Sequence, residues 1–169
     1  EEIVLDEFSH FADHLEALGK LHRAYQAAPR HRQLLDYADV LVLLRDLLTK
    51  DEPTRRTISQ QFRYILVDEY QDTNRLQAEL IRKLAATHDN VMVVGDDSQS
   101  IYAFRGATFR NIMEFPSWFP GAKIYKLEEN YRSTQPILSL ANEIIQEAPE
   151  KYTKHLFTRK LDGPLPALF

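Results

Sequence analysis

Two adjacent carboxylates follow directly on an apolar run, and this pattern carries the clearest chemistry in the chain. The run is Ile65–Val67, and the carboxylates are Asp68 and Glu69. The run has no polar alternation, which predicts a buried strand of a parallel sheet covered on both faces. Open α/β sheets place ligands at the carboxyl ends of such strands, and hard cations such as Mg²⁺ prefer carboxylate oxygens. The pattern is typical of a site for Mg²⁺ and a nucleoside triphosphate; the alternative is a strand that ends at a solvated acidic turn.

Two further predicted strands also end in polar residues. The run at 91–94 leads into Gly95-Asp96-Asp97, Gln99 and the cluster at 102–105, and the run at 124–127 leads into Glu128-Glu129-Asn130-Tyr131-Arg132. Strands that alternate with helices favour an α/β layered, mainly parallel sheet. Because the carboxyl ends of parallel strands meet at one edge of the sheet, we expect Asp68, Gln99 and Arg132 to meet around a single triphosphate.

Together the three blocks resemble the UvrD/Rep/PcrA-type superfamily 1 DNA helicases. DEYQDTN at 68–74, VGDDSQSIYAFRGA at 94–107 and LEENYRS at 127–133 are similar to that family's second, third and fourth helicase motifs, in this order. The resemblance covers about residues 34–160. It implies a partial RecA-like P-loop NTPase domain with a helical N-terminal extension. It also implies an ATP-dependent translocase or helicase that moves 3′ to 5′ on single-stranded DNA, in repair or replication.

The resemblance implies a role for each matching residue at the nucleotide. Asp68 would hold Mg²⁺ through water, and Glu69 would be the general base of ATP hydrolysis. Gln99 would sense the γ-phosphate, since an amide both donates and accepts hydrogen bonds. Tyr131 would stack on adenine, and Arg132 would reach the γ-phosphate with its planar fork. The structural alternatives are that Gln99 is an ordinary turn residue and that Tyr131 and Arg132 only precede a helix.

The cluster at 102–105 is the candidate contact with DNA. By resemblance, Tyr102, Phe104 and Arg105 face single-stranded DNA, where aromatic rings stack bases without reading their sequence. The family often has Trp at the position of Phe104, and Phe keeps the ring face but offers less area. The alternatives are that both rings belong to the core and that Arg105 pairs with Asp96 or Asp97.

A phosphate-binding loop of the form Gly-x-x-x-x-Gly-Lys-Ser/Thr does not occur among the 5 glycines. That loop cradles phosphates with backbone amides and supplies a lysine and a hydroxyl for Mg²⁺. In the family it lies upstream of these blocks, and this sequence opens with Glu1-Glu2-Ile3. We therefore expect an internal fragment of a longer helicase that does not hydrolyse ATP alone. The alternatives are a non-catalytic module that binds DNA or a partner chain, and the motor piece of a helicase–nuclease.

Composition sets broad limits. The chain has 169 residues, a formal net charge of −4 and no cysteine, which excludes disulfides and thiolate metal sites and is compatible with the cytoplasm. The acidic balance argues against a strongly basic nucleic-acid surface, so DNA affinity would come from a local groove or from other domains of the helicase. No apolar run approaches the ~20 residues of a membrane span. His10 and His14 lack a glutamate at metal-site spacing, and we interpret them as a solvated helix face.

The chain divides into three expected regions. Residues 1–33 would end an accessory helical (1B-like) insertion, 34–147 would form the partial ATPase core (1A-like), and 148–169 would lead into a second ATPase domain. Helices are predicted at 6–27, with a break at Pro29 and the basic residues 30–32, at 33–49, after a turn at 51–54, after a capping box at 74–77, at 108–115 and after Ser133 or Thr134. The tail at 151–160 would be loose, as Pro164 and Pro166 suggest. An incomplete parallel sheet leaves an open edge, so we expect the isolated chain to associate or to be poorly stable.

Overall fold

The computed structural model describes residues 9–32, 34–149 and 151–167. The chain divides between Asp46 and Leu47 into two compact units. The first unit contains a 3₁₀ helix, η1 (Ser9–His14), and helix α2 (Leu15–Arg32), and α3 (Tyr37–Lys50) crosses the division. The predicted helix at 6–27 is present from residue 9 onward, and its first residues lie outside the described part.

Two helix limits in this region were predicted wrongly. The predicted break at Pro29 is wrong, because α2 continues to Arg32. A proline lacks the N–H donor of a helical hydrogen bond. The residues around Pro29 nevertheless keep a helical backbone, and α2 ends only at Arg32. Helix α3 begins at Tyr37 and not at 33, since the Asp36 carboxylate accepts the Asp39 N–H at 2.7 Å. An aspartate in this position caps the start of a helix.

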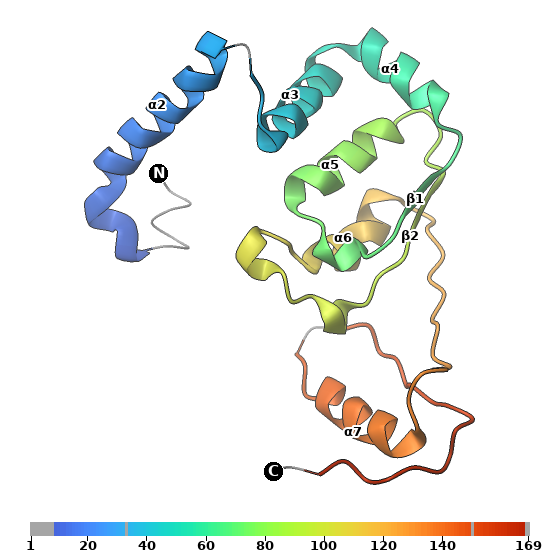
Figure 1. The fold of residues 1–169 in the computed structure, drawn as a ribbon. Coiled ribbons are helices and arrows are strands. Elements are labelled where there is room, and N and C mark those ends of the chain that lie inside the picture. Colours follow the sequence, from blue (N-terminus) through green and yellow to red (C-terminus); the bar gives the residue numbers. More distant parts are fainter. Residues whose placement is uncertain (1–8, 33, 150, 168–169) are drawn as a thin grey trace. The chain divides into compact units, whose positions relative to one another are not determined.

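The second unit holds a small parallel sheet and the helices around it (Figure 1). Its elements are α4 (Glu52–Gln61), β1 (Ile65–Val67), η2 (Tyr70–Asp72), α5 (Arg75–Leu84), β2 (Val91–Val93), η3 (Asp97–Gln99), η4 (Ala103–Arg105), α6 (Arg110–Trp118) and α7 (Gln135–Gln146). Strands β1 and β2 pair in parallel, with Ile65 opposite Val91. The predicted parallel pairing is therefore confirmed. The predicted capping box is also present, because Asn74 and Gln77 exchange side-chain to backbone hydrogen bonds of 2.9 Å.

The core lies on one side of this sheet. Its buried members come from η2, α5 and α6 and from the residues that end these helices, and they are Tyr70, Ala78, Ala85, Phe115 and Phe119. Strands β1 and β2 pack against them through alternate side chains. The other strand face is open, since Leu66 is 71% exposed and Met92 is 56% exposed. The prediction that both faces are covered is therefore wrong for the described residues. The helices pack on one face, and successive strand residues point to opposite faces.

The third predicted strand does not form. In residues 34–149 and 151–167, the sheet consists of β1 and β2, and the run at 124–127 is irregular. Ile124, Tyr125 and Leu127 are exposed. A strand needs a neighbouring backbone to pair with, and the described residues supply none to this run.

Prolines mark the remaining helices. Helix α6 runs through Pro116, which was predicted to end it, and stops at Trp118. Helix α7 follows Thr134 with a proline in its first turn, as predicted, although the Thr134 side chain makes no capping hydrogen bond. Among the described residues, we find no helix whose length and apolar character would allow it to cross a membrane.

Candidate nucleotide and nucleic-acid site

Asp68 and Glu69 lie where β1 ends and the chain turns sharply. Glu69 has φ 49° and ψ 42°, a left-handed conformation that is unusual for a residue other than glycine. Beyond it the Tyr70 N–H donates to the Val94 carbonyl at 2.9 Å, which holds the turn against the end of β2. Both carboxylates are exposed, and Asp68 Oδ1 accepts the Glu69 N–H at 2.9 Å. Backbone strain of this kind is frequent at functional sites, and it places two carboxylates at the carboxyl end of the strand.

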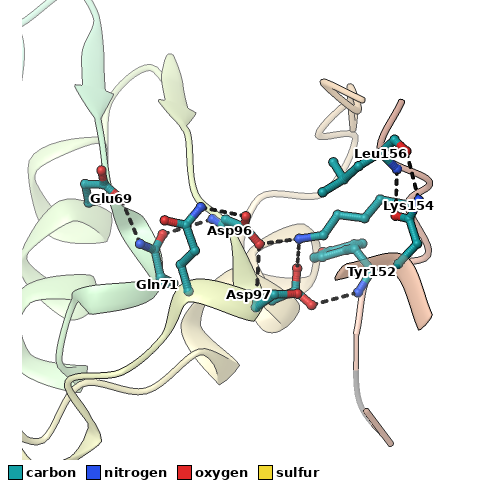
Figure 2. Close-up of polar contacts among 10 residues, drawn as sticks. Glu69, Gln71, Asp96, Asp97, Tyr152, Lys154 and Leu156 are labelled. Carbon is teal, nitrogen blue, oxygen red and sulfur yellow. Dashed lines mark hydrogen bonds and ion pairs between the residues drawn. The ribbon is translucent and has the colours of Figure 1, made fainter. Parts of the chain in front are cut away.

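Gln71 joins the two strand ends. Its amide nitrogen donates to Glu69 Oε2 at 2.8 Å, and its amide oxygen accepts the Asp96 N–H at 3.0 Å (Figure 2). The side chain is only 1% exposed, so these contacts are shielded from water. Gln71 was not among the predicted site residues. The available signal was an amide between two acids of the same block, at 68–74.

Gly95 makes room for the Gln71 amide. A Cβ at position 95 would lie 2.7 Å from Gln71 Oε1 and 2.9 Å from Ile112 Cδ1, closer than side chains tolerate. We expect Gly95→Ala to lower the free energy of unfolding of the chain by about 1–3 kcal/mol, measured by urea denaturation. Gly19→Ala is the control, because its nearest atom is Arg23 Nη1 at 3.5 Å and alanine favours a helix. Equal stability of Gly95→Ala and the unmodified chain would contradict the tight fit.

The loop after β2 holds Gln99 through a carboxylate. Gln99 Nε2 donates to Asp96 Oδ2 at 2.8 Å. Lys154 Nζ contacts the other oxygen of Asp96 and lies 3.3 Å from Asp97 Oδ1 (Figure 2). Burial alone would raise the pKa of Asp96, but the hydrogen bonds from Lys154 and Gln99 outweigh it and hold that pKa below its ordinary value. Asp96 is therefore a carboxylate that orients the Gln99 amide.

Tyr102, Phe104 and Arg105 form a cluster of two rings and a cation. The ring centroids lie 6.0 Å apart, and the Arg105 guanidinium carbon lies 5.2 Å from the Tyr102 centroid and 5.3 Å from the Phe104 centroid. Phe104 is 78% exposed, which contradicts its alternative placement in the core. The described contacts of Arg105 are with these rings, whereas Lys154 pairs with the two carboxylates of the loop. An exposed ring face beside a cation suits base stacking.

Tyr131 lies in a second group of residues, built with the C-terminal segment. Its hydroxyl donates to Glu129 Oε2 at 3.1 Å, and this hydrogen bond raises the pKa of Tyr131. Lys160 Nζ donates to the Tyr131 carbonyl at 2.6 Å. A pocket of about 200 Å³ lies here, lined by Glu129, Asn130, Tyr131, Thr158, Arg159 and Lys160.

The segment that closes this pocket is not loose as predicted. The Phe157 N–H donates to the Glu128 carbonyl at 3.0 Å, and the Asn130 N–H donates to the Phe157 carbonyl at 2.7 Å. Pro164 and Pro166 lie further along the chain. They were therefore weak evidence for looseness in residues that backbone hydrogen bonds hold in place.

The contacts separate the expected site residues into two groups. Glu69 and Gln99 are linked through Gln71 and Asp96, with Asp68 beside them, whereas the pocket at Tyr131 is lined by none of these. Arg132 is exposed next to Tyr131. The predicted meeting of all three blocks around one triphosphate therefore stays a prediction.

The carboxylates at the end of β1 fit a Mg²⁺ ion that takes its other ligands from water and substrate phosphates. In residues 9–32, 34–149 and 151–167, we find no group of three or more His, Cys, Asp or Glu side chains arranged to hold a metal ion. Mg²⁺ usually keeps several waters and takes one or two carboxylates together with substrate phosphates. An exposed Asp68 at the strand end matches that requirement, and a complete protein cage is not needed.

Comparison with known proteins places these features in a family. The sequence model of the UvrD/REP helicase N-terminal domain matches residues 4–120. DNA helicase II of Escherichia coli K12 is 43% identical over 150 residues, which cover 89% of this chain and 21% of that protein. ATP-dependent DNA helicase PcrA of Leuconostoc citreum is 41% identical over 148 residues, which cover 88% of this chain and 20% of that protein. The chain thus spans about a fifth of the length of these relatives.

Proposed function

Because the chain belongs to the UvrD/REP helicase N-terminal domain family, we propose that it supplies part of the ATP-driven motor of a DNA helicase. The motor would move 3′ to 5′ on single-stranded DNA and couple ATP hydrolysis to unwinding in repair or replication. Residues 1–33 would end an accessory helical domain, 34–147 would belong to the first ATPase domain, and 148–169 would lead to the second.

The residues of this chain would divide the work on ATP. Asp68 would hold the hydration shell of Mg²⁺, which neutralises phosphate charge when bound. Glu69 would take a proton from the attacking water. Gln99 would sense the γ-phosphate, and Arg132 would stabilise the charge that develops on it. Tyr131 would stack on adenine.

The observation that best supports this proposal is the continuous link between two strand ends. Three hydrogen bonds form this link. The Gln71 amide donates to Glu69 at 2.8 Å and accepts the Asp96 N–H at 3.0 Å. The Asp96 carboxylate in turn accepts from the Gln99 amide at 2.8 Å. Such a link holds a proton acceptor and an amide at one edge of the sheet. Preorganised groups of this kind are what phosphoryl transfer requires of a protein.

A second candidate is a non-catalytic module that binds DNA or a partner chain, in which the cluster of Tyr102, Phe104 and Arg105 would contact DNA without ATP turnover. ATP hydrolysis by the complete gene product, with and without single-stranded DNA, separates the two candidates. The motor predicts turnover that single-stranded DNA stimulates. Absence of turnover in both conditions would favour the module.

The DNA contact has its own prediction. Phe104→Ala in the complete gene product should weaken binding of a labelled single-stranded oligonucleotide by about 1–3 kcal/mol, followed by fluorescence anisotropy, because one stacking face is lost. The fold should be unaffected, since the ring is 78% exposed. Tyr37→Ala is the control, as that ring is 95% exposed on α3. Equal affinity of Phe104→Ala and the unmodified protein would remove Phe104 from the DNA contact.

A further inference from the structure

Lys154 lies between two neighbouring carboxylates of the loop that follows β2. Its ammonium group contacts Asp96 Oδ1 and lies 3.3 Å from Asp97 Oδ1 (Figure 2). The side chains of Lys154 and Asp97 are only 13% and 6% exposed. The Asp96 side chain is more open, at 32% exposed. Neighbouring carboxylates repel each other, and loss of a shared cation leaves the nearly buried charge of Asp97 uncompensated. Lys154 is therefore the cation that these two carboxylates share.

Asp96 passes this constraint to Gln99. Asp96 Oδ1 accepts from Lys154 Nζ and from the Ser98 N–H at 3.0 Å, and Oδ2 accepts from Gln99 Nε2 at 2.8 Å. A carboxylate held on one oxygen has a fixed direction for hydrogen bonds on the other. Lys154 and the Ser98 N–H thus both hold the carboxylate to which the Gln99 amide donates.

The backbone on both sides of Lys154 is anchored. The Tyr152 N–H donates to Asp97 Oδ2 at 3.3 Å, and the Tyr152 hydroxyl donates to the Ile112 carbonyl at 3.2 Å. Leu156 exchanges two hydrogen bonds, of 2.9 and 2.8 Å, with the buried Asn142 amide. These contacts fix the path of the segment 152–156, so the lysine is held in place before any ligand binds.

We propose that Lys154 is a positioning residue that orients Gln99 through Asp96. Through Lys154, the segment 152–156 becomes part of the site at the end of β2, although this segment is more than 50 residues away along the chain. The consequence for turnover rests on the proposed function, in which Gln99 senses the γ-phosphate. The orientation of Gln99 itself does not rest on it.

The first test follows the Gln99 side-chain amide in the 169-residue chain by NMR, with its resonance identified by its loss in Gln99→Glu. Lys154→Met should shift this resonance, and Lys154→Arg should restore it toward its original position. Lys151→Met is the control, because Lys151 Nζ donates to the Gln146 and Ala148 carbonyls. An unmoved Gln99 resonance in Lys154→Met would overturn the proposal. If Lys154→Met does not fold, Lys154→Leu, neutral and without a donor, is measured with the same two outcomes.

The second test measures ATP turnover by the complete gene product. Lys154→Met should lower kcat by roughly ten- to a hundredfold, as misplaced catalytic groups do, and should change KM for ATP much less. An unchanged kcat beside an active unmodified protein would overturn the role in turnover. A moved Gln99 resonance in a protein without any ATP hydrolysis would support the positioning role and refute the proposed function.

Discussion

Glu69→Gln in the complete gene product should lower ATP turnover by roughly 10²–10⁴-fold, the usual contribution of a positioned general base. An amide of the same shape cannot take the proton of the attacking water. It can still accept the hydrogen bond from Gln71 that the carboxylate accepts at 2.8 Å. The fold and nucleotide binding should therefore persist, so the loss should appear in kcat. Steady-state ATP hydrolysis and equilibrium binding of a fluorescent ATP analogue measure the two quantities.

Glu114→Gln is the matched control for this experiment. It makes the same change of charge at an exposed position of α6, and its turnover should equal that of the unmodified protein. If Glu69→Gln retains full turnover, Glu69 is not the base. Loss of nucleotide binding together with turnover would indicate instead that the carboxylate holds the nucleotide or the fold.

Local features of this fold were open to prediction because neighbouring residues decide them. The capping box at Asn74 needs only two side chains three residues apart. The strands β1 and β2 are recognisable as short apolar runs. The same runs were less informative about which elements bury the faces of the strands. A continuous apolar strand indicates that both faces can be buried, but it does not indicate which layer buries them, and Leu66 stays exposed here.

Contacts between distant segments were not predictable from local pattern. Lys154 and Asp96 are 58 residues apart, and nothing near either residue indicates the other. Gln71 lay inside a selected block, yet its importance comes from burial and from a backbone N–H contributed by β2's exit loop. The run at 124–127 had the composition of a strand and failed to form one, because pairing depends on a neighbour that local sequence does not specify.

Gln71→Met should lower the free energy of unfolding of the chain by about 1–3 kcal/mol, the usual penalty for a buried polar group left without its partner. Methionine keeps the volume but cannot accept the Asp96 N–H, now bound at 3.0 Å. Gln71→Glu should be worse, since it keeps an acceptor for Asp96 but sets a buried negative charge against the carboxylate of Glu69. Urea denaturation of both variants measures the order. Gln60→Met, on an exposed position of α4, should change stability by less than about 0.5 kcal/mol.

The same substitution tests whether Gln71 acts on Glu69. If Gln71 orients the base, Gln71→Met should lower kcat of the complete gene product by roughly ten- to a hundredfold. The double variant Glu69→Gln/Gln71→Met should then be no slower than Glu69→Gln alone, because residues that act as one unit give losses that do not add. Fully additive losses would mean that Gln71 serves the fold independently of the base. Non-additive losses would mean that the buried amide, by bonding to both strand ends, holds the carboxylate toward the nucleotide.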